Sequence, residues 1–169
     1  MRWFVFGAQA LAALGLPRAT QDVDVTVDPG GRSTAEVVDL LADAGLALRD
    51  SFLDEDFVAR TRVLPLVHRS SGTPVDVVLA GPGLEDLQLS RAEVRKLGGV
   101  QVPVIAVNDL VAVKVLAGRP KDLDDVARIL RAAPPELDVL RVRELLAEIG
   151  ALVDDSTLLE TFERLGQRR

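Results

Sequence analysis

The run FGAQALAALGLPRATQDVDVTVD, residues 6–28, joins a glycine-led apolar segment to a strand that carries two carboxylates. Asp22, Asp24 and Thr26 alternate with valines, which is the pattern of a β-strand with one polar and one apolar face. The side chains of Asp22 and Asp24 therefore leave the same face from backbone atoms about 6.5 Å apart. Like charges at this spacing repel each other unless a cation lies between them. The run predicts a cation site at the start of this strand.

The available donor atoms predict which cation is bound. The sequence has no cysteine, and its single histidine, His68, is far along the chain from the two aspartates and is expected near a hairpin turn at the surface. Carboxylates without thiolate or imidazole partners favour Mg²⁺ or Mn²⁺ over zinc, and such ions often bind a substrate phosphate as well. Free backbone N–H groups at the Gly7–Ala8 turn, where a helix begins, suit such an anion. These residues predict metal-assisted phosphoryl or nucleotidyl transfer.

Composition restricts the class of protein. A chain of 169 residues with 48% hydrophobic residues is long enough for one core, so we expect a single domain. No apolar run approaches the roughly 20 residues that cross a bilayer, and the first residues lack a signal-peptide cleavage site, so we expect a cytoplasmic protein with no membrane partner. The formal net charge of −6 disfavours nonspecific binding of nucleic acid.

The hydrophobic pattern predicts α/β structure in the first two thirds of the chain and helices in the last third. Strands are expected at residues 3–6, 22–27, 57–67, 73–79, 92–97 and 100–106, with turns at 69–72 and 98–99. Helices are expected at residues 8–14, 34–44, 109–117, 120–132, 137–149 and 156–165. Ser33 and Glu36 have the spacing of a capping box, and Asn108 and Gly118 are expected to cap the helix at 109–117. Further expected helix-start residues are Asp122, Asp124 and Asp125.

The same residues carry a family resemblance. Gly7-Ala8 followed by Asp22-Val23-Asp24-Val25 resembles the signature of the DNA polymerase β-type nucleotidyltransferase superfamily. The fuller run is similar to stand-alone bacterial nucleotidyltransferases that include the abortive-infection toxins of type IV toxin–antitoxin systems. NDLVAVKVLAGRPKDLDDVARIL, residues 108–130, resembles a later segment of that group. Ala8 is a departure, because the superfamily usually has glycine or serine at this position.

The resemblance implies a nucleotidyltransferase fold, in which helices flank a mixed, mostly antiparallel sheet. The catalytic core would span residues 1–132, and residues 133–169 would be a helical extension of the same domain. The resemblance also implies a third carboxylate on a later strand, and Asp76 is the candidate because it interrupts an apolar strand. Asp22, Asp24 and Asp76 would then be the catalytic residues and the ligands of Mg²⁺ or Mn²⁺.

Further residues are candidates for binding ATP or another nucleoside triphosphate: Gly7, Ala8, Arg18, Thr20 and Lys114. Arg18 lies in the loop before the strand, where it would contact the triphosphate or position the acceptor. Thr20 is expected to order that loop through a side-chain hydrogen bond. Lys114 lies among valines in a helix, so it either extends its ammonium to solvent or reaches a phosphate.

The sequence leaves two classes of function open. The first is an enzyme that moves a nucleoside monophosphate to a hydroxyl of RNA such as a tRNA, of a protein, or of a small molecule such as an antibiotic. A toxin of this kind would have an antitoxin partner. The alternative is a non-catalytic nucleotide-binding or partner-interaction module with the same fold, which Ala8 mildly favours. The two strand aspartates favour the enzyme, because a binding module does not need a metal-binding pair.

Overall fold

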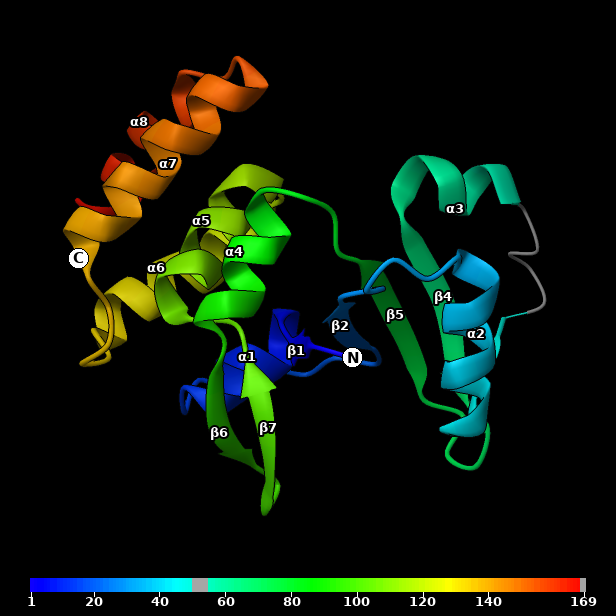
Figure 1. Cartoon of the computed structure of the whole chain (residues 1–169). Helices are drawn as coiled ribbons and strands as arrows, with labels where there is room; N and C mark the ends of the chain where they lie inside the picture. The colour runs from blue at the N-terminus through cyan, green and yellow to red at the C-terminus, as the bar shows by residue number, and fades with distance from the viewer. Residues whose placement is uncertain (50–54, 168–169) are drawn as a thin grey trace. The chain divides into compact units, whose positions relative to one another are not determined.

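The computed structural model describes residues 1–49 and 55–167, and these form two compact units (Figure 1). The first unit comprises Met1–Ala13 and Pro17–Ile105, and the second comprises Leu14–Leu16 and Ala106–Arg169. The expected division into residues 1–132 and 133–169 stays a prediction, because spatial compactness alone does not define a catalytic core.

A mixed sheet forms the centre of the first unit. The strands among its described residues are β1 (Trp3–Val5), β2 (Val23–Val27), β3 (Leu46–Leu48), β4 (Val63–His68), β5 (Pro74–Leu79), β6 (Glu93–Leu97) and β7 (Val100–Val104). Their order is β3-β4-β5-β2-β1-β7-β6. The pairs β2–β5 and β1–β7 are parallel, and the other four pairs are antiparallel. The predicted α/β class with a mostly antiparallel mixed sheet is confirmed.

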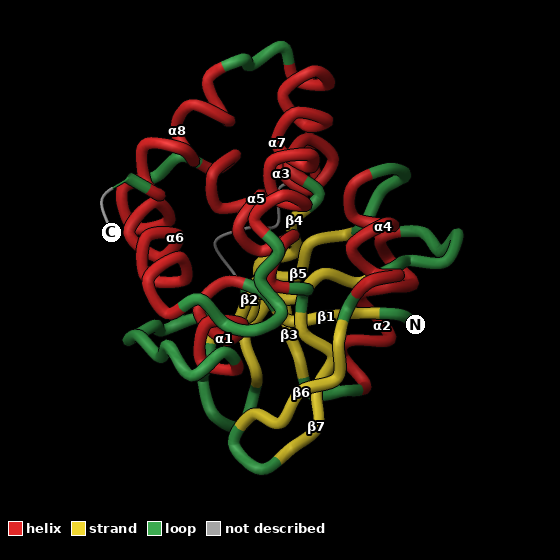
Figure 2. Tube along the Cα trace, turned by 90° about the vertical axis from the view of Figure 1, so that its left-hand side faces the viewer, coloured by secondary structure: helices red, strands yellow, loops and turns green. Residues whose placement is uncertain are grey.

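The helices of the first unit lie on both faces of this sheet. They are α1 (Gly7–Ala13), α2 (Thr34–Asp43), α3 (Glu55–Thr61) and α4 (Leu84–Arg91). Val37 of α2 is fully buried in a cluster with Val27, Leu64 and Val77 of the sheet. The valine face of β2 is therefore the core face under α2, and its aspartates leave the opposite face. Figure 2 shows α1 and α2 on opposite sides of the strands.

The capping box before α2 is confirmed. The Glu36 N–H donates to Ser33 Oγ at 3.3 Å, and the Ser33 N–H donates to the Glu36 carboxylate at 2.8 Å. The Ser33 N–H and the Ser33 hydroxyl, which also donates to Glu36 Oε2 at 2.7 Å, hold the pKa of Glu36 below its ordinary value. The box fixes where the chain turns from the end of β2 into α2.

Parts of the secondary structure differ from the sequence predictions. The strand expected at 57–67 begins only at Val63, because α3 occupies Glu55–Thr61 and Arg62 turns the chain with a φ of +58°. Val58 of α3 packs on the core cluster, and a short apolar run cannot be distinguished from a strand by its pattern. The pattern also missed the three-residue strand β3 and the mainly polar helix α4.

The second unit consists of packed helices. They are α5 (Val107–Ala117), α6 (Pro120–Ala132), α7 (Val139–Val153) and α8 (Thr157–Gly166). The central helix is α5, which packs against the other three and buries residues around its whole circumference. Gly118 ends α5 in the left-handed conformation as expected, with a φ of +62°. Asn108 is not the cap of this helix: Ala106 is, and Asn108 Oδ1 instead accepts a hydrogen bond of 2.9 Å from the Asp138 N–H.

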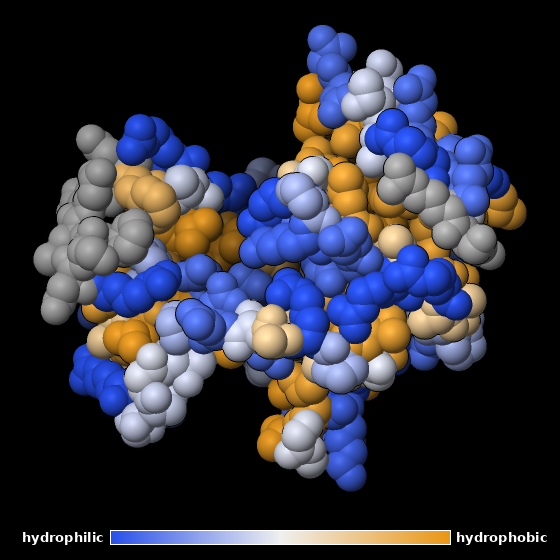
Figure 3. Space-filling view, turned by 180° about the vertical axis from the view of Figure 1, so that it is seen from behind, coloured by the Kyte–Doolittle hydropathy of each residue, from blue (hydrophilic) through white to orange (hydrophobic). Residues whose placement is uncertain are grey.

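The β6–β7 hairpin carries solvent-exposed apolar side chains. Val94 is 67% exposed and Val100 is 63% exposed. Figure 3 shows apolar side chains in this hairpin at the bottom of the view. The two glycines of its turn, Gly98 and Gly99, both have positive φ, which confirms the expected tight connection.

Candidate active site

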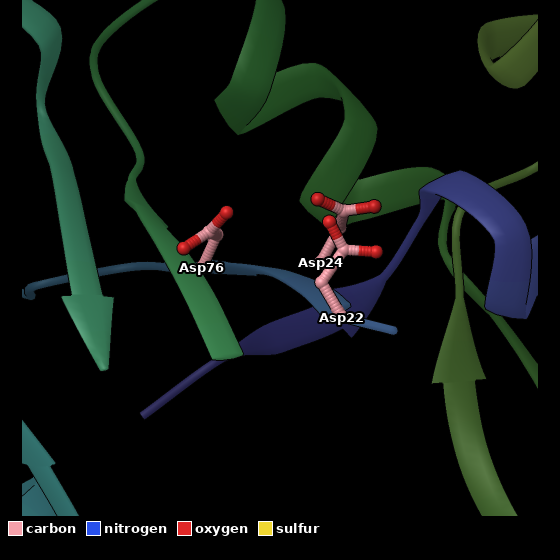
Figure 4. Close-up of side chains that lie close together, drawn as sticks. All are labelled: Asp22, Asp24 and Asp76. Atoms are coloured by element: carbon pink, nitrogen blue, oxygen red, sulfur yellow. The ribbon is translucent and has the colours of Figure 1, made fainter. Parts of the chain in front are cut away.

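The register of the sheet brings three aspartates together. Asp24 of β2 is the direct partner of Asp76 of β5, so the two side chains leave the same face of neighbouring strands. Asp22 lies two residues before Asp24 and leaves that face as well. One oxygen from each of the three carboxylates lies within 4.8 Å of the others. Figure 4 shows Asp22 and Asp24 next to each other and Asp76 facing them from the adjacent strand.

The apolar side chains behind the aspartates hold their strands in place. Val75 and Val77, which flank Asp76, are buried in the core cluster on the other face of the sheet. All three aspartates are half-buried. The strands are thus fixed by hydrophobic burial on one face and present charged groups on the other, which is possible only where water or a cation offsets the charges.

Gly7 approaches Asp24 closely at the start of α1. Its φ is +59°, and a Cβ atom there would overlap Asp24 Oδ2 and lie 2.9 Å from Cγ. The backbone next to it is also tied to β2, because the Phe6 N–H donates to the Asp24 carbonyl at 3.0 Å. Only glycine fits both the left-handed conformation and this contact. The first turn of α1 therefore lies against one carboxylate of the triad.

Ala8 is buried, with 3% of its surface exposed. Its methyl group therefore belongs to the core of the first unit. The expectation that Ala8 offers only its backbone to a phosphate stays a prediction.

The loop between α1 and β2 supports Asp22. Thr20 Oγ1 donates to Asp22 Oδ1 and lies 3.4 Å from the Asp22 carbonyl oxygen. This agrees with the expectation that Thr20 orders the loop. Arg18 Nη1 donates to the Ala19 carbonyl at 3.3 Å in the same loop. Contact of Arg18 with a nucleotide stays a prediction.

Sequence reasoning missed a residue that contacts the triad. Arg49, directly after β3, donates from Nη2 to Asp76 Oδ1. The only signal for Arg49 in the sequence is its position as a charged residue at the end of the apolar run Leu46–Leu48. The sequence did not reveal that this run is a strand. His68, by contrast, lies at the end of β4, where Nδ1 is 2.9 Å from Ser71 Oγ in the hairpin turn.

Lys114 has a different environment from the one expected. In the second unit, its ammonium donates to Asp122 Oδ1 at 3.0 Å and to Asp125 Oδ2 at 2.7 Å. The lysine side chain is 5% exposed, so it does not extend to solvent. Contact with a phosphate stays a prediction, and it would require the ammonium to leave these carboxylates. Asp122 lies in the first turn of α6 as expected, whereas Asp125 lies one turn further along, and both accept from this lysine of α5.

Two arginines complete the buried cluster. Arg119 Nε donates to Asp122, and Arg128 Nη1 lies 3.7 Å from Asp125 Oδ1. Burial raises the pKa of Asp122, but hydrogen bonds from Arg119 and Lys114 outweigh it and hold that pKa below its ordinary value. Arg128 also donates to the Leu16 carbonyl at 3.1 Å, which ties α6 to the segment after α1.

We expect Lys114→Met to lower the free energy of unfolding by about 3 kcal/mol, because the substitution leaves buried carboxylates without their ammonium. Urea unfolding followed by circular dichroism measures this change. Lys121→Met is the control, since Lys121 is exposed on the same pair of helices and should change stability by less than about 0.5 kcal/mol. Equal stability of the two variants would contradict the structural role of the cluster.

The cluster of Lys114, Asp122 and Asp125 is also expected to make the free energy of unfolding depend on pH. The folded-state pKa of Asp122 is lowered, so its contribution to stability is present above the unfolded pKa and is lost as the pH falls through the folded one. The wild type should therefore lose stability below about pH 4, and Lys114→Met should lose less over that range.

The fold and the site agree with a nucleotidyltransferase. A solved structure of an antigenic nucleotidyltransferase-like protein from Paracoccidioides brasiliensis is similar in fold, with a TM-score of 0.53 and 17% sequence identity, covering 94% of this chain and 84% of the other. The family model described as nucleotidyl transferase AbiEii toxin, type IV TA system, matches residues 2–168. The chain belongs to this family and is a nucleotidyltransferase.

No match was found among curated protein sequences. None of the helices in residues 1–49 and 55–167 combines the length and the apolar composition of a membrane span.

Proposed function

We propose that this nucleotidyltransferase moves a nucleoside monophosphate from ATP or another nucleoside triphosphate to a hydroxyl of an acceptor. The observation that carries the proposal is the convergence of Asp22, Asp24 and Asp76 within 4.8 Å. The acceptor hydroxyl would lose its proton to a carboxylate of the triad or to water as its oxygen forms a bond to the α-phosphorus, and the bond from that phosphorus to the oxygen that bridges it to the β-phosphorus would break to release pyrophosphate. Divalent ions, when bound, supply activation of the attacking hydroxyl and charge compensation for the leaving pyrophosphate.

The donor set fits Mg²⁺ or Mn²⁺. The cluster offers carboxylate oxygens and contains neither histidine nor cysteine, which matches the preference of these hard ions. Gly7 leaves no side chain between α1 and Asp24, so the space beside that carboxylate is kept free of a Cβ atom. We assign all three aspartates as metal ligands.

Other residues of this chain would hold the nucleotide and order the site. We assign the backbone N–H groups of Gly7 and Ala8 to the triphosphate, because α1 begins beside Asp24. Arg18 would contact the triphosphate or the acceptor from the loop before β2. Thr20 would act mainly by holding Asp22. Lys114 is also proposed to contact a phosphate, and only the family resemblance supports this role.

We further propose that an antitoxin partner accompanies this chain, as its type IV toxin–antitoxin family suggests. The acceptor is RNA such as a tRNA, a protein, or a small molecule, and the net charge of −6 weakly disfavours RNA. A non-catalytic module is less well supported, because nucleotide binding alone does not need three converging carboxylates.

The test of the reaction is label transfer. The purified chain is incubated with Mg²⁺, cell extract and each of the four ribonucleoside triphosphates, labelled at the α- or the γ-phosphate in parallel. We expect at least one α-labelled nucleotide to label a macromolecule or small acceptor, while γ-label leaves with pyrophosphate. Ribonuclease and protease digestion then identify the acceptor class. Transfer of γ-label, or no transfer from any α-labelled nucleotide, would contradict the proposal.

A further inference from the structure

Arg49 lies in the same row of the sheet as two of the triad residues. Its N–H donates to the Pro65 carbonyl at 3.0 Å, which continues the pairing of β3 with β4 by one residue. Pro65 is the partner of Asp76 in β5, and Asp76 is the partner of Asp24 in β2. Arg49, Pro65, Asp76 and Asp24 therefore lie side by side across four adjacent strands.

The contact between Arg49 and Asp76 spans an intervening strand. Neighbouring strands are about 4.8 Å apart, so the backbones of these two residues are separated by about 10 Å. The long arginine side chain bridges this distance over Pro65, which is buried and has no side-chain polar group that could compete for the guanidinium. The Arg49 guanidinium then reaches Asp76 Oδ1. The register of the sheet thus places one fixed positive charge against the triad.

The exposure of the pair indicates that it contributes little to stability. The side chains of Arg49 and Asp76 are 31% and 32% exposed. Ion pairs that are open to water stabilise a fold only slightly. Arginine has donors but no acceptor, so Arg49 cannot itself be a metal ligand. Its contact takes one oxygen of Asp76, and the second carboxylate oxygen remains for another ligand.

We propose that Arg49 is a positioning residue and internal counter-cation of the triad, an inference that rests on the proposed metal-dependent transfer. It holds the Asp76 carboxylate in the orientation that faces Asp22 and Asp24. Its charge also offsets part of the three negative charges, so the site binds a divalent ion less tightly than three unpaired carboxylates would. Arg49 therefore limits metal affinity and at the same time orders the ligand that the reaction needs.

Removing the positive charge of Arg49 and replacing only its planar guanidinium group have different expected results. Arg49→Gln should bind Mn²⁺ alone about tenfold more tightly, because a nearby positive charge is lost. Its transfer rate at saturating metal should fall by about tenfold or more, because Asp76 is no longer fixed. Arg49→Lys keeps the charge but loses the planar guanidinium that donates to Asp76 Oδ1, so it should keep near wild-type Mn²⁺ affinity and still transfer more slowly.

The experiment titrates Mn²⁺ into each purified variant in the absence of nucleotide and follows free Mn²⁺ by electron paramagnetic resonance. Arg32→Gln is the matched control, because it removes one exposed positive charge on the loop that follows β2. This control should bind Mn²⁺ as the wild type does. Initial rates with α-labelled nucleotide and circular dichroism spectra are recorded for the same samples.

The outcomes separate this inference from the proposed function. If the wild type and Asp24→Asn both fail to bind Mn²⁺, the metal-dependent function is wrong. If the wild type binds Mn²⁺ and Arg49→Gln has unchanged affinity and rate, only the role of Arg49 is wrong. Weaker Mn²⁺ binding by Arg49→Gln would also contradict the counter-cation role. If Arg49→Gln unfolds while Arg49→Lys stays folded and transfers at the wild-type rate, Arg49 has a structural role instead.

Discussion

Asp24→Asn is expected to reduce nucleotidyl transfer by at least about 1000-fold while the protein stays folded. A divalent ion contributes several kcal/mol of transition-state stabilisation, and about 4 kcal/mol corresponds to this factor. The fold should survive, because the contact of Asp24 with Phe6 uses its backbone carbonyl and the amide has nearly the shape of the carboxylate. Loss of one negative charge also reduces repulsion within the triad.

The measurement is the initial rate of α-label transfer at saturating Mg²⁺, with circular dichroism as the check on folding. Asp39→Asn is the matched control, since Asp39 is exposed on α2 and lies outside the triad. It should keep the wild-type rate. A rate for Asp24→Asn within tenfold of the wild type would rule out a catalytic role for this carboxylate.

Gly7→Ala should lower the transfer rate by about 100-fold or more. The new methyl group would overlap Asp24 Oδ2, so either the carboxylate or the first turn of α1 has to move. A displacement of about 1 Å at a reacting group is enough for a loss of this size. The left-handed φ of +59° adds about 1–2 kcal/mol of strain for a residue with a Cβ atom.

Gly15→Ala separates the two effects. Gly15 also has a left-handed φ, of +76°, but no atom lies within 4 Å of a Cβ atom built there. This variant should lose stability through the backbone strain alone and keep a rate within about twofold of the wild type, because the strain is matched and the overlap is absent. Thermal unfolding and initial rates measure both quantities. Equal loss of activity in the two variants would show that the approach of Gly7 to Asp24 is not important.

Local patterns made the main elements of the site predictable. Alternation identified β2 and the common face of Asp22 and Asp24, and the interruption of an apolar strand identified Asp76. The capping box before α2 was also predictable, because its hydrogen bonds join residues three apart. Each of these features depends on neighbours in sequence, and the family resemblance supplied the requirement for a third carboxylate.

Features that depend on distant pairing were not predictable. The parallel register that sets Asp24 opposite Asp76 joins strands about 50 residues apart, and a shift by one residue would have turned one carboxylate to the other face. Arg49 reaches the triad only because β3 pairs with β4 and β4 with β5. The partners of Lys114 were equally hidden, since they follow from the packing of α5 against α6.

The most direct test of the central claim is a crystal structure with Mn²⁺ and a nucleoside triphosphate analogue that cannot be cleaved between the α- and β-phosphates. Anomalous scattering at the manganese edge locates the ion without ambiguity. We expect Mn²⁺ to be bound by carboxylate oxygens of Asp22, Asp24 and Asp76, with the triphosphate beside the first turn of α1. Manganese and analogue bound elsewhere, with none at these three aspartates, would contradict the account.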